Sequence, residues 1–210
     1  MKSISEIRKD YQKGSLNFQE TPEIPIDFFK QWLNAAIESK VEEPTAFTLS
    51  TTDDHGDPVS RVVLLKEVNE NGLIFFTNYQ SQKGKNIEAN HNVYLNFFWP
   101  ELERQVRVKG IAQKLESEKN DEYFYSRPIS SQAGAIISNQ SQTIDESEEL
   151  QLAVDKLVSD PEKIKRPDNW GGYLITPNYF EFWQGRPSRI HDRLAFNKLG
   201  TRWKKSRLSP

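Results

Sequence analysis

Apolar side chains first recur with helical spacing in residues 24–39, after an opening stretch that is polar and mixed in charge. The opening stretch predicts an N-terminal arm over residues 1–24, with about one helical turn. Asp27 is the expected N-cap of the helix, and Pro44 ends the segment. The apolar positions of the helix are Phe28, Phe29, Trp32, Leu33, Ala36 and Ile37.

From residue 45 the apolar positions alternate as they do in strands. A short helix is predicted over residues 81–90. Strands with such short connections pair with their neighbours in antiparallel fashion, which predicts a sheet that curls into a barrel. The five strands are predicted over residues 46–53, 59–68, 73–78, 93–99 and 104–115.

The second half of the chain mixes helices and strands. Residues 116–127 and 145–160 predict exposed helices, whereas residues 130–142 between them are too polar for an ordinary core element. Further strands are predicted over residues 171–176, 179–183, 193–196 and 201–208. We find no repeat and no linker, so the pattern predicts one mainly-β domain with flanking helices (α+β) over residues 25–210.

Composition narrows the chemistry. The 210 residues include no cysteine, which excludes disulfides, thiolate nucleophiles and iron–sulfur clusters. No apolar run has the length of a signal peptide core or a membrane span, so we expect a cytoplasmic protein without a membrane partner. The net charge of −2 argues against a nucleic-acid partner. Residues 189–210 carry seven Arg or Lys and one acid, which indicates either a solvated terminus or an anion site.

Several common catalytic motifs are absent. The chain has no G-x-G-x-x-G after a strand, no P-loop and no G-x-S-x-G elbow. Its three histidines lack metal-ligand spacing, so we expect no metal site.

Two stretches in the first half of the chain combine basic and apolar residues. RVVLLK alternates in a way that predicts a strand covered on both faces, with Arg61 and Lys66 near its ends. Each would then need an anion, unless both reach water from the strand ends. In FTNYQSQKGKN, Lys83 lies at the start of a helix, where backbone N–H groups also favour an anion.

Two further stretches occur in the second half. Tyr123 and Arg127 in YFYSRP are expected on one helical face, with Ser131 just beyond the proline, a set that suits a phosphate ester. In FEFWQGRPSRIHDR, Arg189 and His191 alternate with Arg193, which predicts one cationic face of a strand. Such a face indicates an anionic or electron-rich ligand.

In the same order along the chain, these stretches resemble motifs of the pyridoxine/pyridoxamine 5′-phosphate oxidases. FEFWQGRPSRIHDR resembles the signature of that family, and RVVLLK, ERQVRVKG, YFYSRP, SQAGA, NQS and the terminal RLSP support it. The resemblance implies an FMN-dependent, antiparallel split β-barrel that works as a homodimer with flavin at the subunit interface. It also implies oxidation of pyridoxine or pyridoxamine 5′-phosphate to pyridoxal 5′-phosphate, with dioxygen reduced to hydrogen peroxide.

The same resemblance implies which residues bind FMN. Arg61 and Lys83 would neutralise its phosphate, and Gln105 would hydrogen-bond the ring system. Gln82 stands where the family often has a basic residue, and Phe76 where it often has Tyr. The implied FMN set is Arg61, Val62, Val63, Leu64, Leu65, Lys66, Phe76, Thr77, Gln82, Lys83, Gln105, Gln140, Ser141, Trp183 and Arg193.

The implied substrate residues fall into three groups. One group would hold the phosphate, Arg189 and His191 would meet the reacting part as the catalytic pair, and the N-terminal arm would act as a lid. The implied set is Arg8, Tyr11, Lys66, Tyr123, Arg127, Ser131, Arg189 and His191. Two alternatives stay open, namely another split-barrel flavin oxidoreductase and a non-catalytic carrier of flavin or pyridoxal 5′-phosphate.

Overall fold

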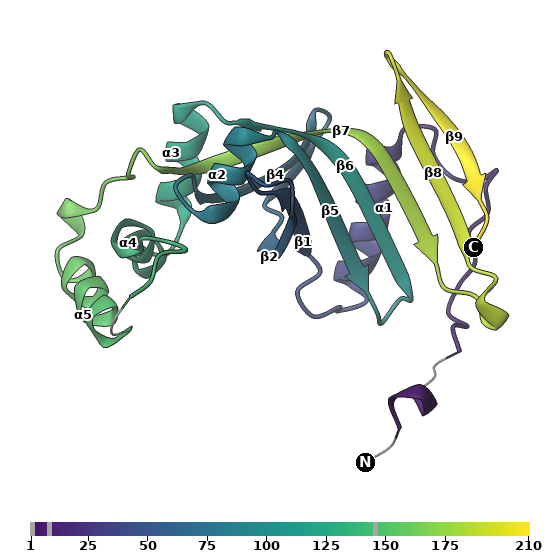
Figure 1. Cartoon of the computed structure of the whole chain (residues 1–210), viewed down its shortest axis with the longest axis horizontal. Coiled ribbons are helices and arrows are strands. Elements are labelled where there is room, and N and C mark those ends of the chain that lie inside the picture. Colours follow the sequence, from purple (N-terminus) through teal and green to yellow (C-terminus); the bar gives the residue numbers. More distant parts are fainter. Residues whose placement is uncertain (1–2, 8–9, 145–146) are drawn as a thin grey trace.

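The computed structural model describes residues 3–7, 10–144 and 147–210, and in these residues nine strands form one antiparallel sheet (Figure 1). The path along the sheet is β2-β1-β5-β6-β7-β4-β3, and β8 pairs with both β7 and β9. The strands are β1 (Ala46–Thr52), β2 (Pro58–Leu64), β3 (Glu67–Asn69), β4 (Gly72–Asn78), β5 (Asn92–Trp99), β6 (Arg104–Lys114), β7 (Trp170–Gln184), β8 (Asp192–Leu199) and β9 (Arg202–Leu208).

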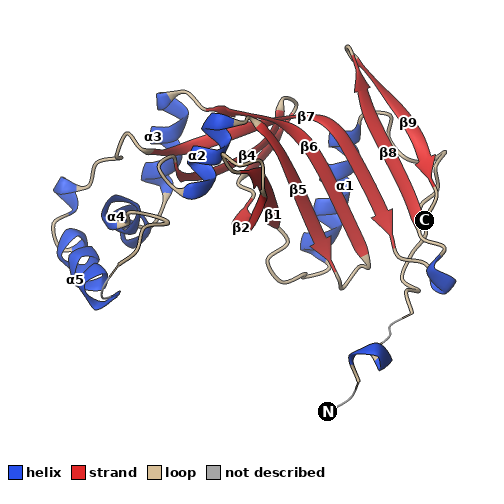
Figure 2. Cartoon of the chain, in the orientation of Figure 1, coloured by secondary structure: helices blue, strands red, loops and turns tan. Residues whose placement is uncertain are grey.

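The helices lie around this curled sheet rather than between its strands (Figure 2). α1 (Pro25–Glu38) covers the core face, while α2 (Gln82–Ala89) follows β4 directly. α3 (Ser117–Ser126), α4 (Ile129–Ile137) and α5 (Ser147–Val158) gather at the other end of the molecule from the β8–β9 hairpin (Figure 1). Short 3₁₀ turns occur at Ile4–Glu6, Pro161–Lys163 and Pro187–Arg189. Among the described residues, no helix is long and apolar enough to cross a membrane.

Aromatic packing between α1 and the sheet builds the main core. The ring of Phe28 lies 4.3 Å from that of Phe182, and the ring of Phe29 lies 4.9 Å from that of Phe97. Because strand residues alternate between faces, these buried positions leave their neighbours on the outer face of the sheet. A second, smaller cluster contains Phe124, Ala133, Ile164 and Trp170 and joins α3 and α4 to the start of β7.

The predicted curled antiparallel sheet is confirmed, but several local predictions are wrong. Asp27 is not the N-cap, because Pro25 begins α1 and makes Ile24 the cap residue. The two strands predicted around Pro177 are one strand, β7, whose register with β6 shifts near that proline. Residues 130–142 were expected to be too polar for an ordinary core element, yet α4 forms there and Ala133 packs into the second cluster.

The strand predicted over residues 59–68 divides into β2 and β3. The chain turns after Leu64, so Leu65 points into the core while Lys66 stays exposed. The expectation that both faces of this stretch are covered is also wrong, since Val62 is 66% exposed. β2 is an edge strand, and Val62 and Leu64 on its outer face are exposed.

Candidate active site

A pocket of about 880 Å³ opens between the β2 edge, the end of β4 and helices α2 to α4. It gathers residues that are distant in sequence but were predicted to share a site, including Arg61, Lys83 and Arg127. The predicted site residues that line it are Arg61, Val62, Val63, Leu64, Lys66, Phe76, Thr77, Gln82, Lys83, Tyr123, Arg127, Ser131, Gln140 and Ser141.

Lys83 is held in this pocket by neutral oxygen atoms. Its Nζ donates to Gln140 Oε1 at 2.9 Å, to Thr77 Oγ1 at 3.2 Å and to Ser81 Oγ at 3.4 Å. Ser81 is the N-cap of α2, so Lys83 enters the pocket from the first turn of that helix. A side chain at Gly84 would meet the Tyr79 carbonyl oxygen at 2.0 Å, so only glycine lets α2 pack this closely.

The positive charges of the pocket are not compensated by acids. Arg61 donates to the Leu49 carbonyl and to Thr51 Oγ1, at 3.3 and 2.8 Å. Burial, with a further contribution from the Arg61 charge, lowers the pKa of Lys83 to about 8. Of the lining residues in the described part of the chain, four are Arg or Lys and none is Asp or Glu. Such a pocket favours an anion.

The predicted phosphate residues converge in this pocket, although not in the expected way. Arg127 is not on the α3 face with Tyr123, because α3 ends at Ser126 and Arg127 adopts an extended conformation. Burial lowers the pKa of Arg127 and raises the pKa of Tyr123. Ser131 lies in the first turn of α4, so the backbone after Pro128 brings it toward the other two.

A second group of predicted residues lies on the outer face of the sheet. Gln105 on β6, Trp183 on β7 and Arg193 on β8 are in register, so their side chains form one row. The Trp183 ring lies 4.7 Å from the His191 ring and 5.5 Å from the Tyr11 ring. We call Tyr11, Glu181, Trp183, His191 and Arg193 the outer cluster.

Glu181 neutralises the arginines of this face. It is only 3% exposed, and its Oε1 accepts from Arg193 Nε at 3.0 Å and Nη2 at 2.8 Å. Its Oε2 accepts from Arg107 Nη1 at 3.2 Å and from the Tyr179 hydroxyl at 2.8 Å. Burial, together with the hydrogen bond to Glu181, raises the pKa of Tyr179. The carboxylate therefore fixes the Arg193 fork in a single orientation.

Arg189 and His191 do not lie on a strand, so the predicted face with Arg193 is wrong. Ser188 and Arg189 have φ values of +57° and +60°, in a 3₁₀ turn that precedes β8. The Arg186 N–H donates to His191 Nδ1 at 3.1 Å, which fixes the orientation of the imidazole ring. The positive φ values redirect the chain before β8 begins, and alternation along the sequence does not reveal them.

The N-terminal segment reaches this cluster through backbone contacts. Glu103 Oε2 accepts from the N–H groups of Gln12 and Lys13 at 2.7 and 2.9 Å. A Cβ at position 185 would lie 2.7 Å from Tyr11 Cγ, so Gly185 is what allows Tyr11 to approach. The predicted helical turn is present at Ile4–Glu6, whereas Arg8 lies outside the described residues.

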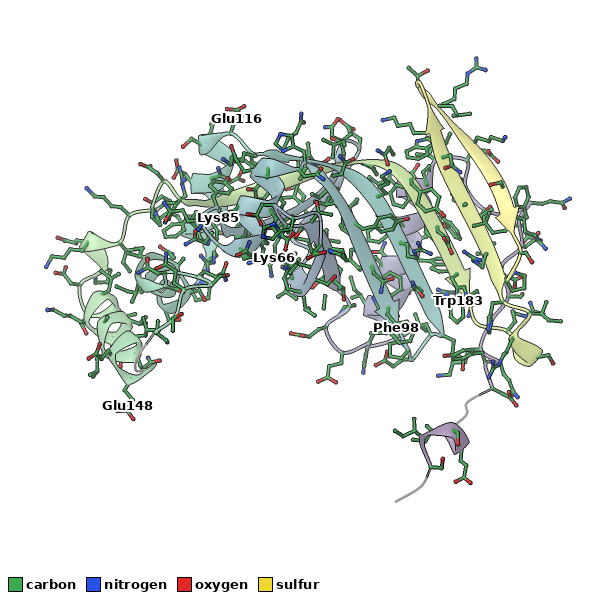
Figure 3. The ribbon with its side chains drawn as sticks, in the orientation of Figure 1. Lys66, Lys85, Phe98, Glu116, Glu148 and Trp183 are labelled. Carbon is green, nitrogen blue, oxygen red and sulfur yellow. The ribbon has the colours of Figure 1, made fainter. Side chains whose placement is uncertain are left out.

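The pocket and the outer cluster do not meet within one chain. Figure 3 shows Lys66 beside the β1–β2 end and Trp183 toward the β8–β9 hairpin. Trp170 in the pocket and Trp183 in the outer cluster lie on the same strand, 13 residues and roughly 40 Å apart along it. In the described chain, the predicted residues that do not line the pocket are Tyr11, Leu65, Gln105, Trp183, Arg189, His191 and Arg193.

Three residues of these two regions escaped the sequence analysis. Glu181 alternates with Trp183 on β7, so strand periodicity inside the FEFW motif could have indicated it. Trp170 and Glu103 carried no such signal, because their roles depend on contacts with Arg127 and with the backbone of the N-terminal segment.

The curled antiparallel sheet defines a split-barrel protein, and the described residues that line the pocket at its edge include four cations and no acid, which favours an anion. A family model described as pyridoxamine 5′-phosphate oxidase matches residues 33–159. A second, described as the pyridoxine 5′-phosphate oxidase C-terminal dimerisation region, matches residues 170–210. The chain belongs to the pyridoxamine 5′-phosphate oxidase family.

Whole-chain similarities agree. The pyridoxine/pyridoxamine 5′-phosphate oxidases of Actinobacillus succinogenes and Haemophilus influenzae are each 51% identical over 209 residues, 99% of either chain. The solved structure of PhzG from Burkholderia lata, in complex with tetrahydrophenazine-1-carboxylic acid, has a TM-score of 0.89 at 30% identity and covers 94% of this chain and 100% of its own. An FMN-binding protein from Nostoc punctiforme shares the fold, with a TM-score of 0.74, 16% identity and coverage of 89% and 98%.

The residues present fit a flavin mononucleotide. Its phosphate needs cations and hydroxyls, which Arg61, Lys83 and Thr77 provide, with Gln140 beside them. A second phosphate group would find Arg127, whose buried Nη1 has no hydrogen-bond partner among the described residues. The pocket therefore has donors for more than one phosphate.

Proposed function

We propose that this chain is the FMN-dependent oxidase that converts pyridoxamine 5′-phosphate and pyridoxine 5′-phosphate to pyridoxal 5′-phosphate. Dioxygen is the electron acceptor and leaves as hydrogen peroxide, and the amine substrate also takes up water and releases ammonia. The observation that carries the proposal is the pocket, whose described lining residues include four cationic side chains and no carboxylate, in a chain 51% identical to such oxidases.

In this proposal, the β4–α2 side of the pocket holds the cofactor. Arg61 and Lys83 bind the FMN phosphate, and Thr77 and Gln140 complete its hydrogen bonds. Gln82 adds no charge there, which leaves those two cations to carry the electrostatic attraction. When bound, FMN supplies the redox chemistry, taking two electrons from the substrate and passing them to dioxygen.

The α3–α4 side of the pocket then holds the substrate phosphate. Lys66 and Arg127 contribute charge, and the hydroxyls of Tyr123 and Ser131 contribute hydrogen bonds. This subsite is remote from the reacting carbon, so it contributes affinity and orientation rather than chemistry.

His191 of the outer cluster and Arg189, on the turn just before it, act on the reacting end of the substrate. Arg189 lies on an exposed turn and would clamp the substrate ring, while His191 orients the polar substituents of the ring. The N-terminal segment, through Tyr11, closes over them as a lid. Residues 25–210 form the flavin domain to which this lid belongs.

A second copy of the chain would unite the two regions. The outer face of the sheet exposes Val62 and Phe98, at 66% and 50%, and residues 170–210 match a dimerisation region. A twofold pairing of these faces would bring the outer cluster of one chain to the pocket of the other. Each of two identical sites would then draw on both chains, with FMN at the interface.

The visible absorption spectrum of the purified protein tests the proposal. We expect a flavin spectrum that bleaches on anaerobic addition of pyridoxamine 5′-phosphate and returns with air, with peroxide released. Protein that neither contains nor takes up FMN would contradict the proposal. A spectrum unchanged by either substrate would instead indicate a carrier, and bleaching by a reduced nicotinamide alone would indicate another flavin oxidoreductase.

A further inference from the structure

Arg127 is held in the pocket mainly by an aromatic ring. Its guanidinium carbon lies 4.6 Å from the centroid of the Trp170 ring and 5.9 Å from that of Phe124. Among the described residues, no carboxylate pairs with it, and its buried Nη1 lacks a hydrogen-bond partner. The ring face therefore accounts for the position of the charged end of this side chain.

The Trp170 ring is itself fixed from several sides. Phe76 lies parallel to it with ring centroids 5.6 Å apart, and Tyr123, which stacks on Phe76 at 3.9 Å, also lies parallel to the indole at 6.2 Å. Phe124 contacts the indole edge-on at 5.2 Å, and Trp170 is only 6% exposed. These rings thus connect Phe76 at the end of β4 to Tyr123 and Arg127 of the phosphate subsite.

The backbone of Trp170 is equally constrained. It pairs with Asn78 at the start of β7, and its carbonyl accepts from Arg166 Nη1 at 3.0 Å. Arg166 is held in turn by Asp121, at 2.6 Å. Trp170 is therefore a constrained platform for the Arg127 guanidinium.

A ring and a carboxylate position an arginine with different consequences. A carboxylate neutralises the charge and occupies the hydrogen-bond donors, whereas a ring attracts the charge and leaves the donors at the guanidinium edge available. We propose that Trp170 is a positioning residue that holds the Arg127 guanidinium by its face, so that its donors remain available for the phosphate of the substrate. This inference rests on the proposed function, in which Arg127 binds that phosphate.

Substitution of Trp170 in the FMN-loaded enzyme tests the proposal. The probe is the dissociation constant of pyridoxal 5′-phosphate, measured by titration, beside kcat and KM for pyridoxamine 5′-phosphate. We expect Trp170→Leu to weaken binding roughly five- to thirtyfold and to raise KM with kcat nearly unchanged. Trp170→Phe, which preserves a ring face and the packing, should lose less.

A matched control and a double substitution separate positioning from packing. Ile164→Ala loosens the same buried cluster but leaves the ring face of Trp170 under Arg127, so its affinity should stay within roughly twofold of the parent. In an Arg127→Ala background, Trp170→Leu should have almost no further effect, because the residue through which it acts is gone.

Two results would overturn the inference alone. One is a loss of pyridoxal 5′-phosphate affinity from Trp170→Leu that is the same with and without Arg127. The other is a loss of affinity from Ile164→Ala that is as large as the loss from Trp170→Leu. If Arg127→Ala by itself leaves pyridoxal 5′-phosphate affinity unchanged, the proposed phosphate subsite is wrong and the inference falls with it. The Arg127→Ala measurement therefore distinguishes failure of the inference from failure of the proposed function.

Discussion

Arg127 in the pocket and Arg193 in the outer cluster are both partly buried arginines, but their neighbours are opposite in kind. Arg193 is paired with the carboxylate of Glu181, whereas Arg127 lies on the face of Trp170. The same difference extends to Lys83, whose partners in the pocket are neutral oxygens. Charge that is already compensated stabilises the fold, and charge left uncompensated is available to a ligand at some cost in stability.

The largest loss of catalytic rate should come from substitution of Arg189, which we place at the reacting end of the substrate. Arg189→Met is expected to slow flavin reduction about a hundredfold while FMN stays bound, because misplacement of the reacting carbon slows its reaction. Anaerobic stopped-flow bleaching with pyridoxamine 5′-phosphate measures that step. Parent-like reduction rates in both Arg189→Met and His191→Asn would remove these residues from the mechanism.

Arg127→Ala should affect affinity and not rate, in contrast to the Arg189 variant. Loss of a charge-assisted hydrogen bond to phosphate should raise KM roughly ten- to hundredfold and leave kcat nearly unchanged. Steady-state kinetics with pyridoxamine 5′-phosphate provide both values. An unchanged KM, or a fall in kcat as large as that of Arg189→Met, would break the division between the two halves.

Loss of a charge should raise the stability of the apoprotein when the charge is Lys83 in the pocket, and lower it when the charge is Glu181 in the outer cluster. Lys83→Met removes an uncompensated buried charge, so we expect the apoprotein to unfold at a higher temperature but to bind FMN more weakly. Glu181→Gln leaves two arginines without their carboxylate and should cost about 1–3 kcal/mol of unfolding free energy. Thermal melts of both apoproteins compare them directly, and shifts of the same sign would contradict the contrast.

The pH dependence of FMN binding should reflect Lys83, whose pKa is about 8 without ligand. A bound phosphate raises that pKa, so affinity should fall above about pH 8 by at most about tenfold per pH unit. The unfolded chain keeps this proton to roughly pH 10.4, so the contribution of Lys83 makes apoprotein stability rise with pH between these values. Calorimetry in two buffers should detect proton uptake on FMN binding, and Lys83→Met should abolish it.

The sequence was sufficient to predict most of the strands, because apolar and polar residues alternate between the two faces of each strand. Phe97 and Phe182, which are buried against α1, lie at alternating positions of two such predicted strands. The turn with Arg189 could not be predicted, since alternation carries no signal for the positive φ values at Ser188 and Arg189. The Tyr11 ring that packs against Gly185 and His191 also comes from a distant part of the chain. The exposure of Val62 also could not be predicted, because burial of an edge strand depends on what lies beyond it.

Strand β7 has a genetic consequence. Its length separates Trp170 in the pocket from Trp183 in the outer cluster. A substitution that impairs one of these two regions therefore leaves the other region of the same chain intact. In the proposed dimer each site draws on both chains, and Arg127 and Arg189 belong to different regions. Mixed dimers of Arg127→Ala and Arg189→Met would then contain one undamaged site. Random reassociation of equal amounts should restore about a quarter of the parent activity. Complementation between two defective alleles of this gene should therefore occur in a cell that makes both chains.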